Sequence, residues 1–128
     1  MPKIIVVDDN GATRMSAARV LTTAGYEVVT MPDAESAFSA IVSDSFDLVL
    51  SDIVMPGVDG LQLLIRIRNR YPYARVVMMT GTHHDSKIRE GAFLLGACDF
   101  LTKPFSQEEL LAVIRNALEG EAALELPA

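Results

Sequence analysis

The fold is decided by one stretch of sequence, Leu48-Val49-Leu50-Ser51-Asp52-Ile53-Val54-Met55-Pro56-Gly57-Val58-Asp59-Gly60. Its apolar first part ends in a carboxylate, Asp52, and Pro56 and Gly57 break the chain before a helical period begins at Leu61. Such a run is typical of a parallel strand buried on both faces, with Asp52 at its carboxyl end. Ligands of open α/β sheets bind outside the carboxyl ends of the strands, so this position indicates a functional site. The alternative is that Asp52 only caps the following helix.

Four further segments have the composition of strands, and helical periodicity follows each of them. The segment 26–30 is the most polar, which is typical of an edge strand. The strands are expected at residues 3–7, 26–30, 48–51, 75–79 and 99–102. The helices are expected from 12 to about 24, from 33, from 61 to 71, up to 96, and from the capping box Ser106–Glu109 onward. Five strands alternating with five helices predict an α/β domain with a doubly wound, five-stranded parallel sheet of the flavodoxin-like type.

The composition limits the classes of function. A chain of 128 residues is long enough for one domain, which we expect to cover residues 1–120, with 121–128 as a short C-terminal tail or the start of a linker. The formal charge of −6 disfavours direct binding of nucleic acid, because phosphate backbones are bound by clustered Lys and Arg. The apolar runs are too short for membrane insertion or a signal peptide. We therefore expect a soluble, cytoplasmic domain.

Polar side chains follow four of the five expected strands. Asp8 and Asp9 follow the first strand, Asp52 the third, Thr80 the fourth and Lys103 the fifth. The second strand contributes none. Strand order 2-1-3-4-5 explains this omission, because it places the second strand at the edge and the first and third side by side. Each residue alone could be a helix cap, an ordinary strand end or a surface charge, but their joint position at four strand ends favours a site.

The residue types at these strand ends suit Mg²⁺ and phosphoryl chemistry. Crowded carboxylates repel one another unless a cation neutralises them, and Mg²⁺ accepts one or two carboxylates together with a phosphate oxygen. A carboxylate such as Asp52 can attack phosphorus to give an aspartyl phosphate. Lys103 can then pair with one phosphoryl oxygen, while the Thr80 hydroxyl and a backbone N–H after Asp52 serve another. The sequence thus predicts a phosphoacceptor site.

This constellation resembles the receiver domain of two-component response regulators, and the resemblance covers residues 3 to 119. The matching motifs are Val6-Val7-Asp8-Asp9-Asn10, Ser51-Asp52-Ile53-Val54-Met55-Pro56-Gly57-Val58-Asp59-Gly60, Met79-Thr80-Gly81, and Gly96-Ala97-Cys98-Asp99-Phe100-Leu101-Thr102-Lys103-Pro104-Phe105. The resemblance implies that Asp52 accepts a phosphoryl group from a histidine kinase or a histidine phosphotransfer protein. It also implies a signalling domain that assists its own phosphorylation and dephosphorylation, not a turnover enzyme.

The same resemblance implies roles for further residues. Asp8 and Asp9 would bind the metal together with Asp52 and the backbone carbonyl of Val54, and the Lys103-Pro104 peptide bond would be cis. Thr80 and Phe100 occupy the switch positions. Phosphorylation would draw the Thr80 hydroxyl toward the phosphate and let the Phe100 ring swing inward. The surface of the fourth helix, last strand and last helix would then bind a downstream protein or an attached output domain.

Several positions separate this chain from related patterns. The switch aromatic is Phe100 where the family often has Tyr, and Val113 stands where winged-helix receivers usually carry an Arg for dimer pairing. A Mg²⁺-dependent phosphohydrolase is disfavoured, because such enzymes commonly have a second Asp two residues after the nucleophile and this chain has Val54 there. A flavin-binding module is disfavoured because Asp8 and Asp9 would repel a flavin phosphate. The pair His83-His84 is predicted to lie in a solvated loop.

Overall fold

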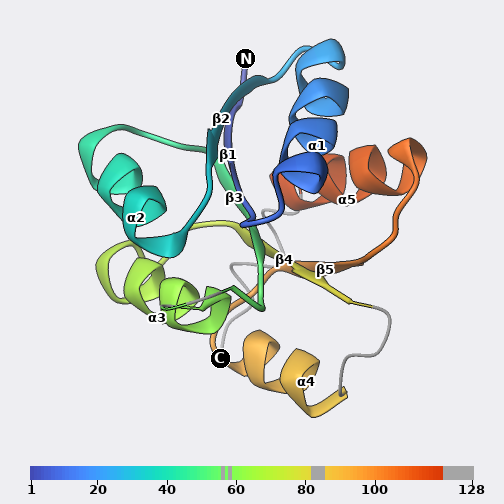
Figure 1. Cartoon of the computed structure of the whole chain (residues 1–128). Helices are drawn as coiled ribbons and strands as arrows, with labels where there is room; N and C mark the ends of the chain where they lie inside the picture. Colours follow the sequence, from blue (N-terminus) through green and yellow to red (C-terminus); the bar gives the residue numbers. More distant parts are fainter. Residues whose placement is uncertain (56, 58, 82–85, 120–128) are drawn as a thin grey trace.

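The structure is a computed structural model that describes residues 1–55, 57, 59–81 and 86–119, without the side chains of residues 86–88. Strands and helices alternate along the whole of this part of the chain (Figure 1). Their bounds are β1 (Lys3–Val7), α1 (Gly11–Thr23), β2 (Glu27–Met31), α2 (Ala34–Ser43), β3 (Leu48–Asp52), α3 (Gly60–Arg70), β4 (Val76–Thr80), α4 (Ser86–Leu94), β5 (Asp99–Thr102) and α5 (Gln107–Glu119). The predicted sequence of elements is confirmed.

The five strands form one parallel sheet in the order β2-β1-β3-β4-β5. The predicted α/β flavodoxin-like topology, with β2 at an edge, is therefore confirmed. Two strands are displaced by one residue from the prediction, since β2 covers Glu27–Met31 and β4 covers Val76–Thr80. The strand β3 extends one residue further than expected, to Asp52. Asp52 and Thr80 are consequently the last residues of their strands, where ladder hydrogen bonds fix the backbone.

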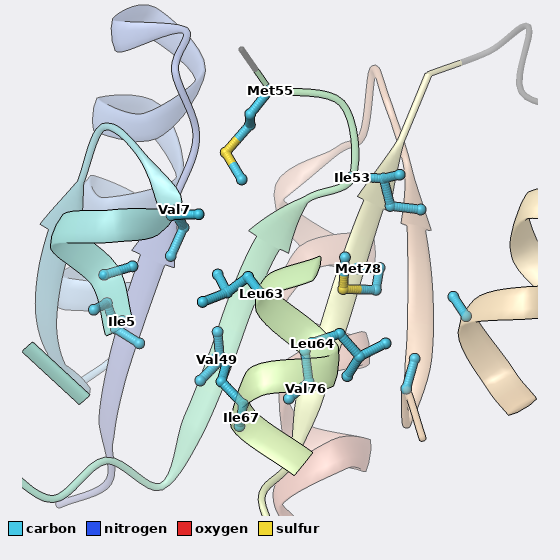
Figure 2. Close-up of a cluster of buried hydrophobic side chains, with 14 of the residues drawn as sticks. Ile5, Val7, Val49, Ile53, Met55, Leu63, Leu64, Ile67, Val76 and Met78 are labelled. Carbon is cyan, nitrogen blue, oxygen red and sulfur yellow. The ribbon is translucent and has the colours of Figure 1, made fainter. Parts of the chain in front are cut away.

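Helices cover both faces of the sheet, so side chains that alternate along each strand enter two separate cores. One core joins the sheet to α2, α3 and α4, and Figure 2 shows part of it, including Val49 and Met78 of the strands beside Leu64 and Ile67 of α3. The other core joins the opposite face of the sheet to α1 and α5. Burial on both faces explains why β1, β3 and β4 are nearly continuous apolar runs.

Local polar contacts set where the helices begin. Asn10 accepts a hydrogen bond from the Thr13 N–H at the start of α1, and Asp59 accepts one from the Gln62 N–H at the start of α3. Each of these two residues caps its helix by satisfying one of the free N–H groups of the first turn. Asp8, Asp9 and Asp52 therefore do not cap these helices, which was the alternative role considered for them from the sequence.

The last helix begins as the sequence predicts. The Glu109 N–H donates to the Ser106 hydroxyl at 3.0 Å, and the Ser106 N–H donates to the Glu109 carboxylate at 2.8 Å. This reciprocal pair is the expected capping box.

Among the described residues, no helix is long and apolar enough to cross a membrane.

Candidate functional site

The carboxyl ends of the central strands gather three carboxylates. Asp8 directly follows β1 and Asp52 ends the adjacent strand β3. One oxygen from each of Asp8, Asp9 and Asp52 lies within 4.8 Å of the others. Asp8 is fully buried and Asp52 is 8% exposed, whereas Asp9 is exposed to solvent. The topology thus brings together the three acidic residues that the sequence singles out.

Lys103 joins this group from the edge of the sheet, since it directly follows the edge strand β5. Its ammonium nitrogen donates to Asp8 Oδ2 at 2.8 Å and to Asp52 Oδ2 at 3.0 Å. The Lys103 backbone N–H donates to the Thr80 carbonyl at 2.7 Å, which continues the pairing of β5 with β4 past the end of β5. The Lys103-Pro104 peptide bond is cis, as the family resemblance implies. One ammonium therefore bridges two carboxylates from different strands.

Burial and charge act in opposite directions on the titrating groups. Burial raises the pKa of Asp52, and the hydrogen bond from Lys103 only partly offsets this rise. For Lys103, burial favours the neutral amine, but the hydrogen bonds to Asp8 and Asp52 outweigh it and raise the pKa of the ammonium. The lysine thus stays charged at neutral pH. One positive charge faces three carboxylates, so the site has room for further positive charge.

The donor set of this site fits a magnesium ion. All three side chains offer hard carboxylate oxygens, one of them is open to solvent, and they converge within a few ångströms. The excess of carboxylates over ammonium groups favours a divalent cation. For Val54, the described contact is the donation of its N–H to Asp52 Oδ1 at 3.3 Å. The metal-binding role of its carbonyl stays a prediction.

Thr80 supplies a buried hydroxyl beside the acidic group. Thr80 ends β4, one residue beyond Met79, which is the register partner of Asp52. The residue is 3% exposed, and its Oγ1 has no hydrogen-bond partner within the described part of the chain. A buried hydroxyl without a hydrogen-bond partner lowers the stability of the folded state, and such groups are therefore unusual in a folded core. Its position at this strand end makes it a candidate donor to a ligand oxygen.

The backbone around Asp52 depends on a glycine whose role sequence reasoning missed. A Cβ atom on Gly60 would lie 2.0 Å from the Asp52 carbonyl oxygen. The Gly60 N–H donates to the Ile53 carbonyl at 2.8 Å, which closes the loop between β3 and α3. Only glycine permits so close an approach. The signal in the sequence was a glycine at the first helical position, directly after the capping Asp59.

Phe100 lies away from the carboxylates, on the face of the sheet covered by α4. The residue is 5% exposed, and its ring meets the ring of Phe93 edge-on, with centroids 4.7 Å apart. The guanidinium of Arg89 lies 5.1 Å from the Phe100 ring centroid. The structure therefore presents the buried arrangement of Phe100, under cover of α4. The histidines at 83 and 84 lie outside the described residues.

The fold and the strand-end carboxylates define a flavodoxin-like α/β domain with a cluster of three carboxylates at the carboxyl ends of its central strands. Residues 4–115 match the family described as response regulator receiver domain. The chain belongs to this family, whose members act in two-component signalling. The resemblance inferred from the motifs is thereby confirmed.

Similar proteins of known sequence are response regulators. The chain is 39% identical to the response regulator protein FleR of Pseudomonas aeruginosa over 96% of its own length and 28% of that protein. It is 40% identical to the transcriptional regulatory protein FixJ of Bradyrhizobium diazoefficiens over 90% of its length and 56% of that protein. The chain thus spans between about a quarter and just over half of these relatives.

Solved receiver structures have the same fold. The receiver domain of NtrX from Brucella abortus is 40% identical, with a TM-score of 0.86 over 91% of this chain and 98% of that one. The chemotaxis protein CheY4 of Vibrio cholerae is 29% identical, with a TM-score of 0.87 over 91% of this chain and 98% of that one. These likenesses support the topology independently of the motif comparison.

Proposed function

We propose that this domain accepts a phosphoryl group on Asp52 from a histidine kinase or a histidine phosphotransfer protein, in a Mg²⁺-dependent reaction. The observation that carries the proposal is the position of Asp52. It ends the central strand, it is hydrogen-bonded to Lys103, and it shares a cluster with two further carboxylates. An aspartate serving only as structure would not need to be crowded against like charges.

The reaction is a transfer between two nucleophiles. An Asp52 carboxylate oxygen forms a bond to phosphorus while the bond from phosphorus to the donor's imidazole nitrogen breaks, so the electron pair of that bond stays with the imidazole. Lys103 hydrogen-bonds both Asp8 and Asp52, and it can transfer one of these bonds to a phosphoryl oxygen. The Val54 N–H and the Thr80 hydroxyl, which has no partner among the described residues, can donate to the remaining oxygens.

Magnesium, held by the carboxylates of Asp8, Asp9 and Asp52 and by the Val54 carbonyl, would supply the positive charge that offsets the phosphoryl oxygens. Val54, two residues after the phosphoacceptor, has an apolar side chain that is 74% exposed. It can neither donate nor accept a proton, which supports a signalling domain that assists its own phosphorylation and dephosphorylation over a hydrolase.

The phosphoryl group would be reported on the surface formed by α4, β5 and α5. Thr80 lies at the end of β4, next to β5, which carries Phe100. A Thr80 hydroxyl drawn toward a phosphoryl oxygen would alter the backbone after β4 and thereby the contact of Phe93 with Phe100. A downstream protein or an attached output domain would bind there. Within this proposal, residues 1–120 form the receiver and 121–128 are a tail or the start of a linker.

Phosphorylation by acetyl phosphate tests the proposal directly. The intact mass of the domain should rise by one phosphate when Mg²⁺ is present and not when it is chelated. Asp52→Ala should abolish the gain, whereas Asp47→Ala should not, because Asp47 is an exposed aspartate just before the start of β3, at the end of the strand opposite to the site. Equal phosphorylation of the Asp52→Ala variant would refute the assignment.

A further inference from the structure

Arg14 is joined to the acidic cluster through the backbone. It is the fourth residue of α1, it is partly buried, and its terminal nitrogen Nη1 donates to the Asp8 carbonyl oxygen at 2.7 Å. Among the ion pairs of the described residues, none includes Arg14. The guanidinium therefore binds the main chain at the site and not a carboxylate. Neither the charge pattern nor the motifs of the sequence pointed to this contact.

The bonded carbonyl belongs to the peptide unit that links Asp8 to Asp9. Because a peptide unit is planar, a hydrogen bond that fixes its oxygen also fixes the direction in which the Asp9 backbone leaves. Asp8 has other supports: its N–H donates to the Met31 carbonyl, its Oδ1 accepts from the Asn10 N–H, and its Oδ2 accepts from Lys103. Loss of one support would leave Asp8 in place.

Asp9 has no comparable support. Its side chain is exposed, and no hydrogen bond to it is found in the described part of the chain. Its carboxylate nevertheless lies within 4.8 Å of those of Asp8 and Asp52. The backbone alone must therefore direct Asp9 toward its neighbours. The Arg14 side chain holds the peptide unit that precedes Asp9. The Asn10 N–H, which donates to Asp8 Oδ1, holds the peptide unit that follows it.

We propose that Arg14 is a positioning residue that directs the Asp9 carboxylate into the Mg²⁺ site, and that it acts through its hydrogen bond to the Asp8 carbonyl. The proposal rests on the metal site of the proposed function. The hydrogen bond and the positive charge of Arg14 have opposite effects on the affinity for Mg²⁺. Loss of the positive charge near the carboxylates would strengthen binding of a divalent cation. Loss of the hydrogen bond would misplace a ligand and weaken binding, as changes to the partners of metal ligands do.

The experiment measures the dissociation constant of Mg²⁺ by amide NMR titration of the unphosphorylated domain. Arg14→Met removes both the hydrogen bond and the charge, and we expect about 10-fold weaker Mg²⁺ binding. Its matched control is Arg19→Met, which removes the same charge from an exposed position of the same helix. We expect the control to bind Mg²⁺ as tightly as the parent, or slightly more tightly.

A second readout needs no metal. The Asp9 amide shares its peptide unit with the Asp8 carbonyl, so its ¹⁵N shift in Mg²⁺-free protein should change in Arg14→Met and not in Arg19→Met. Equal or tighter Mg²⁺ binding by Arg14→Met would overturn the proposal. If that variant does not fold, Arg14→Gln, which is neutral and too short to reach the carbonyl, is judged by the same outcomes. A parent domain that binds no Mg²⁺ would instead refute the metal site itself.

Discussion

The ammonium nitrogen of Lys103 lies 3.0 Å from Oδ2 of Asp52, a residue 51 positions earlier in the chain. The same nitrogen lies 2.8 Å from the fully buried carboxylate of Asp8. This pairing ties the end of β5 to the centre of the sheet. It also governs how stability and reactivity should respond to mutation and to pH.

Lys103→Met should destabilise the domain. Asp8 and Asp52 would lose a charged hydrogen-bond donor while remaining close to each other, which we expect to cost about 2 kcal/mol in the absence of Mg²⁺. Urea unfolding at neutral pH measures this difference. The double variant Lys103→Met with Asp52→Asn should recover part of the loss, because one of the two repelling charges is then gone. Full stability of the single variant would contradict the account.

The parent domain should lose stability in alkaline solution through Lys103. The pKa of Lys103 is raised in the folded state above its ordinary value of 10.5. Its contribution is therefore fully present below about 10.5 and is lost as pH rises through the higher folded value. Unfolding curves between pH 9 and 12 should show this loss in the parent and a smaller one in Lys103→Met. If stability falls equally with pH in the parent and in Lys103→Met, groups other than Lys103 cause the alkaline loss and the prediction is wrong.

Asp52 should affect the stability of the folded domain in the acidic to neutral pH range. Burial raises its pKa in the folded state, so the folded domain binds this proton more tightly than the unfolded chain. The ionised carboxylate then reduces stability as pH rises above the range where an unfolded aspartate titrates. Asp52→Asn should gain stability over the parent on going from pH 4 to pH 7, measured without Mg²⁺. A variant that loses ground over this interval would show that Lys103 outweighs burial.

Mg²⁺ should stabilise the folded domain. Binding to the folded state alone adds about 2.7 kcal/mol when the ion reaches a hundred times its dissociation constant. Asp9→Asn should remove most of this gain, because it replaces one of three carboxylates in the cluster with a neutral amide. The melting temperature with and without Mg²⁺ measures the effect, with Asp33→Asn as a control at a helix cap outside the site. A parent melting temperature that ignores Mg²⁺ would argue against a metal site.

Gly60→Ala should be destabilising although alanine is the better helix former. The new Cβ would stand 2.0 Å from the Asp52 carbonyl oxygen, and the backbone that carries the phosphoacceptor must move to make room. We expect a cost of about 2 kcal/mol and slower phosphorylation by acetyl phosphate. Gly91→Ala is the matched control within α4, where a Cβ meets nothing within 4 Å. It should stabilise the domain by about 0.5–1 kcal/mol.

Thr80→Val should leave the unphosphorylated domain as stable as the parent or slightly more stable. The hydroxyl that it removes is buried and lacks a partner in the described chain, so no hydrogen bond is lost. The variant should nevertheless respond differently to beryllofluoride with Mg²⁺, a mimic of the phosphoryl group. In the parent we expect amide NMR shifts around Phe93 and Phe100, and in Thr80→Val much smaller ones. Identical distal shifts in both proteins would refute the coupling through Thr80.

Local patterns in the sequence predicted the order of elements and most of their ends. Apolar runs without interruption indicated strands buried on both faces, and Ser106 with Glu109 indicated the start of α5. These signals work because each depends on residues a few positions apart. The one-residue displacement of β2 and β4 shows their limit, since a strand end is set by the ladder with its neighbour and not by composition.

The sequence alone determined, to within one residue, where each strand stops, because an apolar run marks a strand that is buried on both faces. It thereby also determined which polar side chains stand near the strand ends, and the one strand without such a side chain indicated the edge of the sheet. Only the tertiary structure decided which atoms meet there. The contacts of Lys103 with Asp8 and of Arg14 with the Asp8 carbonyl, and the close approach of Gly60 to Asp52, join different elements. Such contacts depend on the twist of the sheet and on how helices pack against it, which no local periodicity encodes.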